Sequence, residues 1–181
     1  MSAEDPLQAL VRRCQGGDAA AFEELFRRFQ PRLRYYVRRL DAGGDHTDDT
    51  LQEVWAKVVR GIGALKDRRA FVAWLYTIAR NEVYGRAKAK DPFVELTKEH
   101  LESLTDDPEP VFREEDAARI HQALETLSPA QREILTLCFL EELSHQEIAA
   151  ILGLPTGTVK SRLHYAKQAL RQELERDYGS P

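Results

Sequence analysis

The sequence predicts an all-α protein made of two small helical domains joined by an acidic linker. Apolar residues recur at intervals of three and four along most of the chain, and strand-like alternation between turns is hard to find. Between residues 91 and 113, prolines and acidic side chains interrupt this periodicity, which is typical of a linker. The predicted boundaries are therefore 1–90, 91–113 and 114–181. The linker is either a plain disordered spacer or a spacer with a short helix near 97–104.

Four helices are expected in the first domain. The second carries a long apolar stripe from Phe22 to Leu40, begins after an N-capping Asp18, and contains Pro31, which is expected to kink or split it. In the third, the side chains expected to face the core are Leu51, Val54, Trp55, Val58 and Val59. The expected ranges are Pro6–Gln15, Ala19–Leu40, Thr47–Arg60 and Arg68–Lys88.

The second domain shows the pattern of a helix-turn-helix. Ser128-Pro129 starts one helix, Ser144 with Glu147 forms a capping box for the next, and Gly153 stands where that helix must end with positive φ. In the following helix, Val159, Leu163 and Ala166 are expected to face the core. The residues expected on its outer face are Thr156, Thr158, Lys160, Ser161, Arg162 and His164. From spacing alone, this face either binds DNA or is merely the solvated side of a helical hairpin.

Composition and charge narrow the function classes. The net charge is −4, but acidic residues gather between 91 and 115, whereas residues 1–90 carry a net positive charge. Basic stripes suited to phosphate contacts therefore remain on both flanks. No apolar run approaches a membrane span, and the N-terminus lacks the pattern of a secretory signal. Cys14 and Cys138 are expected to be buried free thiols, which suits the cytoplasm and leaves a redox role open.

Two further stretches carry polar residues at helical spacing. On the helix from Phe71 to Lys88, one side combines a large aromatic residue with groups that can hold phosphates or base edges, namely Trp74, Thr77, Arg80 and Asn81. The alternative is that this tryptophan simply belongs to the core. Near the start of the third helix lie Asp48, Asp49, Gln52 and Glu53. Acidic side chains at this end of a helix stabilise it, because they interact favourably with the helix dipole. Only His46 is nearby as another ligand, so no catalytic, metal or cofactor site is expected.

Three motifs, in this order, make the chain resemble the bacterial extracytoplasmic-function (ECF) sigma factors. Asp49 to Trp55 is similar to the family's D-x-x-Q-E-x-F/W segment, and Phe71 to Asn81 is similar to its F-x-x-W-L-x-x-I-A-x-N helix. Leu127 to Arg132, with the Ile148–Gly153 and Gly157–Leu163 segments, resembles the family's second domain. The resemblance implies a σ2-like domain, a σ4-like helix-turn-helix domain, and no enzymatic activity.

The resemblance also implies partners and site residues. Core RNA polymerase is expected to bind Asp49, Gln52, Glu53 and Val54. The minus-ten promoter element is expected to meet the 61–69 loop, where Leu65 and Lys66 receive a flipped base, and then Trp74, Thr77, Arg80 and Asn81. For the minus-thirty-five element the expected residues are Thr156, Thr158, Lys160, Ser161, Arg162, His164 and Tyr165. Thr77 and Tyr165 stand where the family commonly has basic residues, which points either to an altered promoter preference or to weaker phosphate anchoring, and not to lost function. An anti-sigma factor is the expected regulator.

Two other functions remain to be distinguished. A stand-alone helix-turn-helix regulator would bind duplex DNA as a palindrome-reading dimer. A small helical enzyme would have to use Asp48, Asp49 and Glu53, and it would depend on a metal or a substrate. A sigma factor would instead bind DNA weakly by itself and start transcription only with core polymerase.

Overall fold

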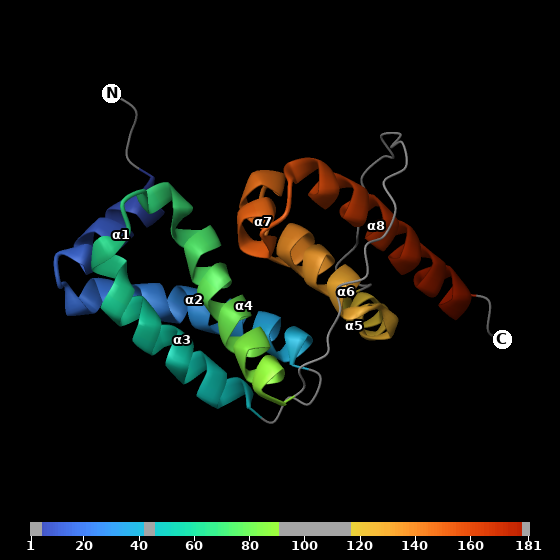
Figure 1. Ribbon diagram of the computed structural model, residues 1–181, viewed down its shortest axis with the longest axis horizontal. Coiled ribbons are helices and arrows are strands. Elements are labelled where there is room, and N and C mark those ends of the chain that lie inside the picture. The colour runs from blue at the N-terminus through green and yellow to red at the C-terminus, as the bar shows by residue number, and fades with distance from the viewer. Residues whose placement is uncertain (1–4, 42–45, 91–116, 179–181) are drawn as a thin grey trace. The chain divides into compact units, whose positions relative to one another are not determined.

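The computed structural model describes residues 5–41, 46–90 and 117–178, and all regular structure within these ranges is helical (Figure 1). The predicted linker, 91–113, with its short helix, lies outside the described residues. The α-helices are α1 (Pro6–Gln15), α2 (Ala19–Leu40), α3 (Thr47–Gly61), α4 (Phe71–Lys90), α5 (Ala117–Thr126), α6 (Pro129–Leu135), α7 (His145–Leu152) and α8 (Thr156–Tyr178). Two 3₁₀ turns, Ile62–Ala64 and Arg68–Ala70, lie between α3 and α4, and a π-helical turn, Thr136–Leu140, follows α6.

The helices form two compact units, which are described separately. The first contains α1 to α4, and the second contains α5, α6, most of α7, and α8. An all-α fold is thus confirmed. The unit boundaries that were expected at residues 90 and 114 fall at or within the part of the chain that is not described, so they remain predictions.

In the first unit, α2, α3 and α4 pack on one another through a core of aromatic and branched side chains. Phe29 meets Phe71 edge to face at 5.5 Å between ring centroids, and Tyr36 meets Tyr76 in the same way at 5.1 Å. These two pairs lie along α2 and α4 in the same order, so the two helices run in the same direction. α2 continues as one helix through Pro31, because its apolar stripe is buried both before and after that residue.

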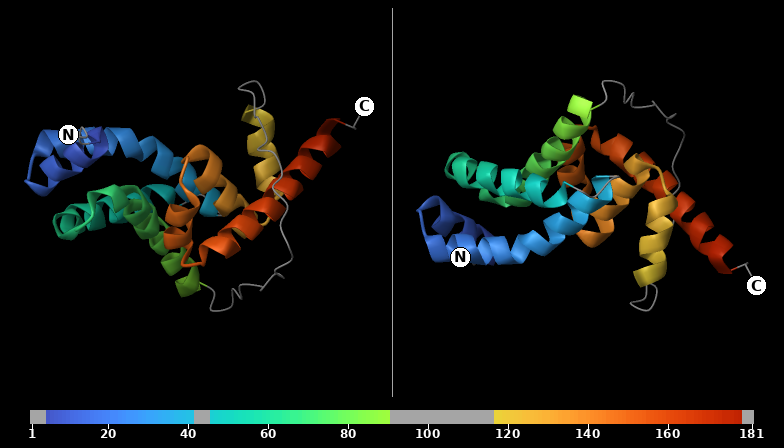
Figure 2. Two further views of the ribbon diagram at one scale, coloured as in Figure 1. Left: turned by 90° about the horizontal axis from the view of Figure 1, so that it is seen from above. Right: turned by 90° about the horizontal axis from the view of Figure 1, so that it is seen from below.

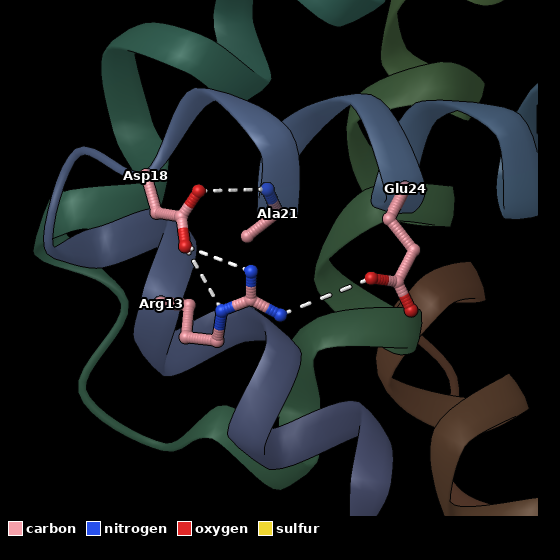
Figure 3. A network of polar contacts seen from close by, with 4 residues as sticks. All are labelled: Arg13, Asp18, Ala21 and Glu24. Atoms are coloured by element: carbon pink, nitrogen blue, oxygen red, sulfur yellow. Dashed lines mark hydrogen bonds and ion pairs between the residues drawn. The ribbon is translucent and has the colours of Figure 1, made fainter.

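A polar network fixes the bend between α1 and α2 (Figure 3). Gly17 adopts a positive φ of 83°, and Asp18 then caps α2 by accepting a 3.0 Å hydrogen bond from the Ala21 amide. Arg13 donates from Nε to the other Asp18 oxygen at 2.9 Å and lies 3.9 Å from Glu24. These contacts, the Ala21 amide first, hold the pKa of Asp18 below its usual range.

In the second unit, α8 packs against both α5 and α6 (Figure 2). Arg132 ties the end of α5 to α6, because its guanidinium donates to the carbonyl oxygens of Leu124 at 2.9 Å, Glu125 at 2.9 Å and Leu127 at 3.1 Å. The capping boxes at Ser128 and Ser144 are both present. The helix starts predicted at these two serines are therefore confirmed.

Several predictions of burial are wrong. Val59 is 57% exposed, because it lies beside the buried Trp55–Val58 stripe of α3 and not within it. Phe26 is also exposed, although it belongs to the apolar stripe of α2. Cys14 is buried as expected, and that burial raises the pKa of its thiol, but Cys138 in the π-helical turn is only half-buried. The fourth helix begins as a 3₁₀ turn at Arg68 and becomes α-helical at Phe71.

Candidate functional sites

The helix-turn-helix of the second unit is built by two local signals. Ser144 caps α7, and Gly153 ends it with φ of 66°, so that the Leu154 amide can donate to the Ala149 carbonyl oxygen at 3.1 Å. The chain then turns through Pro155 into α8. The positive φ predicted at Gly153 is confirmed.

Burial along α8 separates a core face from an outer face. Val159, Leu163 and Ala166 are buried as predicted. Thr156, Lys160 and Tyr165 are exposed, whereas Thr158, Arg162 and His164 are half-buried. Val159, Leu163 and Ala166 thus form a buried apolar seam along α8. On the other side, the first turns of α8 present hydroxyl and cationic groups outward.

One residue of that predicted outer face is misplaced. Ser161 is only 6% exposed, and its hydroxyl lies 3.1 Å from the Thr158 carbonyl oxygen and 3.3 Å from that of Gly157. A short hydroxyl can bond back to its own helix, which satisfies it without solvent or a ligand. Its outward placement was wrong for this reason. Gly157, by contrast, has open space where a Cβ would stand, so the fold itself does not require glycine there.

The segment between α3 and α4 forms a short loop against α4. Leu65 is half-buried and Lys66 exposed. A Cβ placed on Gly61 would come within 2.9 Å of Cζ2 of Trp74, so the absence of a side chain at Gly61 lets the indole lie against the loop. Trp74 is half-buried, so it is not a fully buried core residue, and its contact with a base stays a prediction.

The other predicted residues of α4 follow Trp74 along its helix. Thr77 is half-buried and donates from Oγ1 to the Ala73 carbonyl oxygen at 2.7 Å. The guanidinium of Arg80 lies 4.7 Å from the ring centroid of Tyr84, a cation–π distance, and Asn81 is exposed. The structure thus brings Trp74, Arg80 and Asn81 onto one helix with the loop at its N-terminal end.

The start of α3 presents the third predicted surface. Asp49, Gln52 and Glu53 are exposed, but Val54 is fully buried. Its predicted contact with a partner is wrong, because the i, i+3, i+4 spacing from Leu51 to Val58 places Val54 in the core. Asp48 pairs with Arg34 of α2, and within the described ranges no group of three or more His, Cys, Asp and Glu side chains could hold a metal ion.

Sequence reasoning missed two exposed apolar residues near this surface. Phe26 of α2 is 36% exposed and packs at 5.0 Å on Trp55 of α3, and Val59 lies one turn after Trp55. Both were assigned to the core because their spacing is that of an amphipathic stripe. Helical spacing alone does not distinguish these two residues from their buried neighbours.

No helix in the portion of the chain that is described is long and apolar enough to cross a bilayer.

Comparison with known proteins decides the family. Residues 25–92 match Sigma-70 region 2, and residues 117–170 match Sigma-70, region 4. The ECF RNA polymerase sigma factor RpoE of Cereibacter sphaeroides is 34% identical over 159 residues, covering 87% of this chain and 88% of that protein. The chain belongs to the ECF RNA polymerase sigma factors. The ECF sigma-E factor of Escherichia coli is 33% identical, with 93% and 94% covered, and the sigma-H factor of Pseudomonas aeruginosa is 31% identical, with 97% of each covered.

Solved structures agree with this ECF sigma factor fold. RpoE of Bartonella quintana, in complex with the anti-sigma factor NepR, has a TM-score of 0.66 at 26% identity, covering 85% of this chain and 96% of that one. CnrH, in complex with the cytosolic domain of CnrY, has a TM-score of 0.68 at 22% identity, covering 96% and 99%. As an ECF sigma factor, the chain serves transcription initiation and is not an enzyme.

Proposed function

We propose that this ECF sigma factor binds core RNA polymerase in the cytoplasm and directs it to two-part promoters through three separate surfaces. The observation that carries the proposal is that α8 has one buried face and one exposed face. Its buried seam of Val159, Leu163 and Ala166 fixes the helix, while Thr156, Lys160 and Tyr165 are left exposed. A helix that packs on α5 and α6 and follows a short helix and a tight turn has the geometry that places a recognition helix in the major groove.

Reading of the minus-thirty-five element is assigned to the start of α8. Thr156 and Thr158 lie in its first turn, where hydroxyls and backbone amides favour a phosphate. Lys160, Arg162, His164 and Tyr165 follow on the outward and flanking positions, and Lys and Arg are the side chains that best contact guanine edges and phosphates. Gly157 supports this assignment, since open space at its Cα leaves room for a close backbone approach. Ser161 is left out because it is buried.

Reading of the minus-ten element is assigned to the loop before α4 and to α4 itself. Leu65 and Lys66 lie in the loop, and Trp74, Thr77, Arg80 and Asn81 continue from it along the helix. An aromatic face next to a cation and an exposed amide is the combination that binds unstacked bases. The half-exposed indole of Trp74, fixed against Gly61, supports this role better than a fully buried tryptophan would.

Docking on core polymerase is assigned to α3 together with the neighbouring part of α2. Asp49, Gln52 and Glu53 are exposed and carry the resemblance to the family's polymerase-binding segment. We replace Val54 in this surface by Phe26 and Val59, since exposed apolar side chains beside polar ones are typical of a protein interface.

Control by an anti-sigma factor is part of the proposal. The relative RpoE of Bartonella quintana, 26% identical, was solved in complex with the anti-sigma factor NepR. We infer that a protein of this class covers the polymerase-binding and DNA-binding surfaces of the present chain. The exposed apolar residues Phe26 and Val59 are suitable contacts for it.

The test is in vitro transcription with purified bacterial core polymerase and a randomised promoter library. The full chain is expected to start transcription from a sequence-defined subset, and core polymerase alone is not. Glu53→Ala should weaken capture of core polymerase, with Glu175→Ala, at an exposed position near the end of α8, as the matched control. Lys160→Ala should lower initiation about fivefold or more, with Gln168→Ala as its control. Absence of both capture and initiation would overturn the proposal, and dimeric binding to a palindrome without polymerase would favour the stand-alone regulator.

A further inference from the structure

A side chain of α1, that of Gln15, makes hydrogen bonds to the loop between α3 and α4. The amide nitrogen of Gln15 donates to the carbonyl oxygen of Ile62 at 3.0 Å and to that of Leu65 at 2.8 Å. Its amide oxygen accepts from Nε of Arg68 at 2.8 Å. Both polar atoms of Gln15 are therefore used on a segment that follows it by about fifty residues in the sequence.

These three contacts surround the part of the loop that is assigned to DNA. Leu65 and Lys66 are the residues expected to receive the base. Ile62 lies three residues before Leu65, and Arg68 lies two residues after Lys66. α1 lies beside both 3₁₀ turns of the loop (Figure 1). The half-buried Gln15 thus holds the backbone just before Lys66 and the side chain of Arg68 just after it, while Lys66 itself stays exposed.

The loop also has bonds of its own, but they act within each turn. The Leu65 amide donates to the Ile62 carbonyl oxygen at 3.2 Å, and Asp67 accepts from the amide of Arg69 at 3.0 Å and from its Nε at 3.1 Å. Bonds of this kind shape the two turns separately. Gln15 contacts both turns, so it sets their relative position and with it the direction in which Leu65 and Lys66 point.

We propose that Gln15 is a positioning residue for promoter reading, which pre-forms the loop that receives a base of the minus-ten element. The proposal rests on the function assigned above, because it needs the loop to contact DNA. Flipping a base out of the stack costs free energy that only a well-placed receiving site can offset. A loop ordered before DNA arrives does not lose conformational entropy on binding, so holding it in place favours both affinity and discrimination.

Two substitutions separate the ways in which Gln15 acts. Gln15→Glu keeps an acceptor for Arg68 but replaces the donor by a carboxylate facing the carbonyl oxygens of Ile62 and Leu65. Gln15→Leu keeps the approximate size and removes all three bonds. The matched control is Gln8→Leu, the same change about two turns earlier on α1. A tether to the carbonyl oxygens predicts that both Gln15 variants are affected, Gln15→Glu at least as strongly, and that the Gln8 variant is not.

The experiment compares these full-length variants with core polymerase on the randomised promoter library. We expect Gln15→Glu and Gln15→Leu to reduce the base preference at one or two minus-ten positions by about fivefold, the effect of losing roughly one hydrogen bond. Preference at the minus-thirty-five positions should stay as in the parent chain, because α8 is unchanged. Unaltered minus-ten preference, or an equal loss of initiation from every promoter, would overturn the positioning role.

Hydrogen exchange of the free chain provides a measurement that does not need polymerase. The amides of residues 62–70 are expected to exchange faster in both Gln15 variants, while amides in α2 and α3 keep their protection. Unchanged exchange in the loop would overturn the inference even if the chain acts as a sigma factor. If the parent chain fails to initiate at all, the proposed function fails, and the inference fails with it.

Discussion

Trp55 of α3 donates a hydrogen bond from its indole Nε1–H to Oε1 of Gln30 in α2, at 2.6 Å. Trp55 is 7% exposed. The ring centroids of Phe22 and Phe26 lie 5.9 Å and 5.0 Å from that of its indole. An N–H on a side chain this little exposed needs a hydrogen-bond partner, and Gln30 supplies it. Gln30→Leu is therefore expected to destabilise the first unit by about 1–3 kcal/mol in urea unfolding.

A double-mutant cycle isolates this hydrogen bond. Trp55→Phe removes the donor, so Gln30→Leu in that background should cost much less than it does in the parent chain. Unfolding can still be followed by the fluorescence of Trp74, since both tryptophans lie in the first unit. Equal costs in the two backgrounds would show that the bond does not stabilise the α2–α3 contact.

Gly61 and Gly63 make a matched pair for the loop before α4. A Cβ at Gly61 would lie 2.9 Å from Cζ2 of Trp74, whereas a Cβ at Gly63 would meet nothing within 4 Å. Gly61→Ala should force the indole to move, at a cost of about 1–3 kcal/mol that exceeds the gain in helix propensity. Gly63→Ala should be neutral or slightly stabilising.

Tryptophan fluorescence reads out this comparison directly. Gly61→Ala is expected to shift the emission of Trp74 and to lower the midpoint of urea unfolding, while Gly63→Ala leaves the emission as it was. If Trp74 supports minus-ten reading, initiation by the Gly61 variant falls more than its stability loss explains at a temperature where it is folded. Identical emission spectra for the two variants would contradict the contact.

The acid stability of the α1–α2 bend should depend on Asp18. The pKa of Asp18 is lowered chiefly by the hydrogen bond from the Ala21 amide and then by Arg13. Because the folded pKa lies below the unfolded one, the carboxylate stabilises the fold fully above about pH 4, and this contribution is lost as pH falls through the folded pKa.

Asp18→Asn separates the charge from the cap, since asparagine also caps helices but does not titrate. Urea unfolding of both proteins at about pH 6 and about pH 3 should show the parent losing more stability than the variant. The pKa of Asp67 is lowered too, chiefly by Arg69, but that group is present in both proteins and cancels. A parent–variant difference that does not change with pH would rule out this role of the carboxylate.

Elements governed by local rules were predictable from the sequence. The seam of Val159, Leu163 and Ala166 follows from helical periodicity, and the turn before it follows from Ser144 and Gly153, since each signal acts within a few residues. The three motifs likewise predicted the ECF sigma factor family, which the matches to Sigma-70 regions 2 and 4 confirm.

What could not be predicted depends on neighbours distant in sequence. Val54 and Val59 have the same chemistry, yet only the packing of α2 and α4 on α3 decides that the first is buried and the second exposed. The position of Ser161 in the sequence favours a DNA contact, and only the structure shows that its side chain is buried. Gln15 carries no signal in the sequence, because two of its partners are main-chain oxygens, which any sequence would provide, and the third, Arg68, lies far away in the chain.

Gly153 offers a test of the helix-turn-helix geometry. It adopts φ of 66° and ψ of 35°, in the left-handed region, and a Cβ there would meet nothing within 4 Å. Gly153→Ala should therefore cost about 1–2 kcal/mol through backbone strain alone, without a steric clash. Gly153→Asn should cost less, because asparagine tolerates this conformation.

The measurement is hydrogen exchange of the α7 and α8 amides in the full chain, since the tryptophans do not report on this unit. Protection is expected to fall in the order parent, Gly153→Asn, Gly153→Ala, and initiation from promoters with a strong minus-thirty-five element should fall in the same order. The protection of α2 and α3 should not change, which separates this effect from global unfolding. If alanine and asparagine prove equally disruptive, the left-handed turn does not limit the stability of the helix-turn-helix.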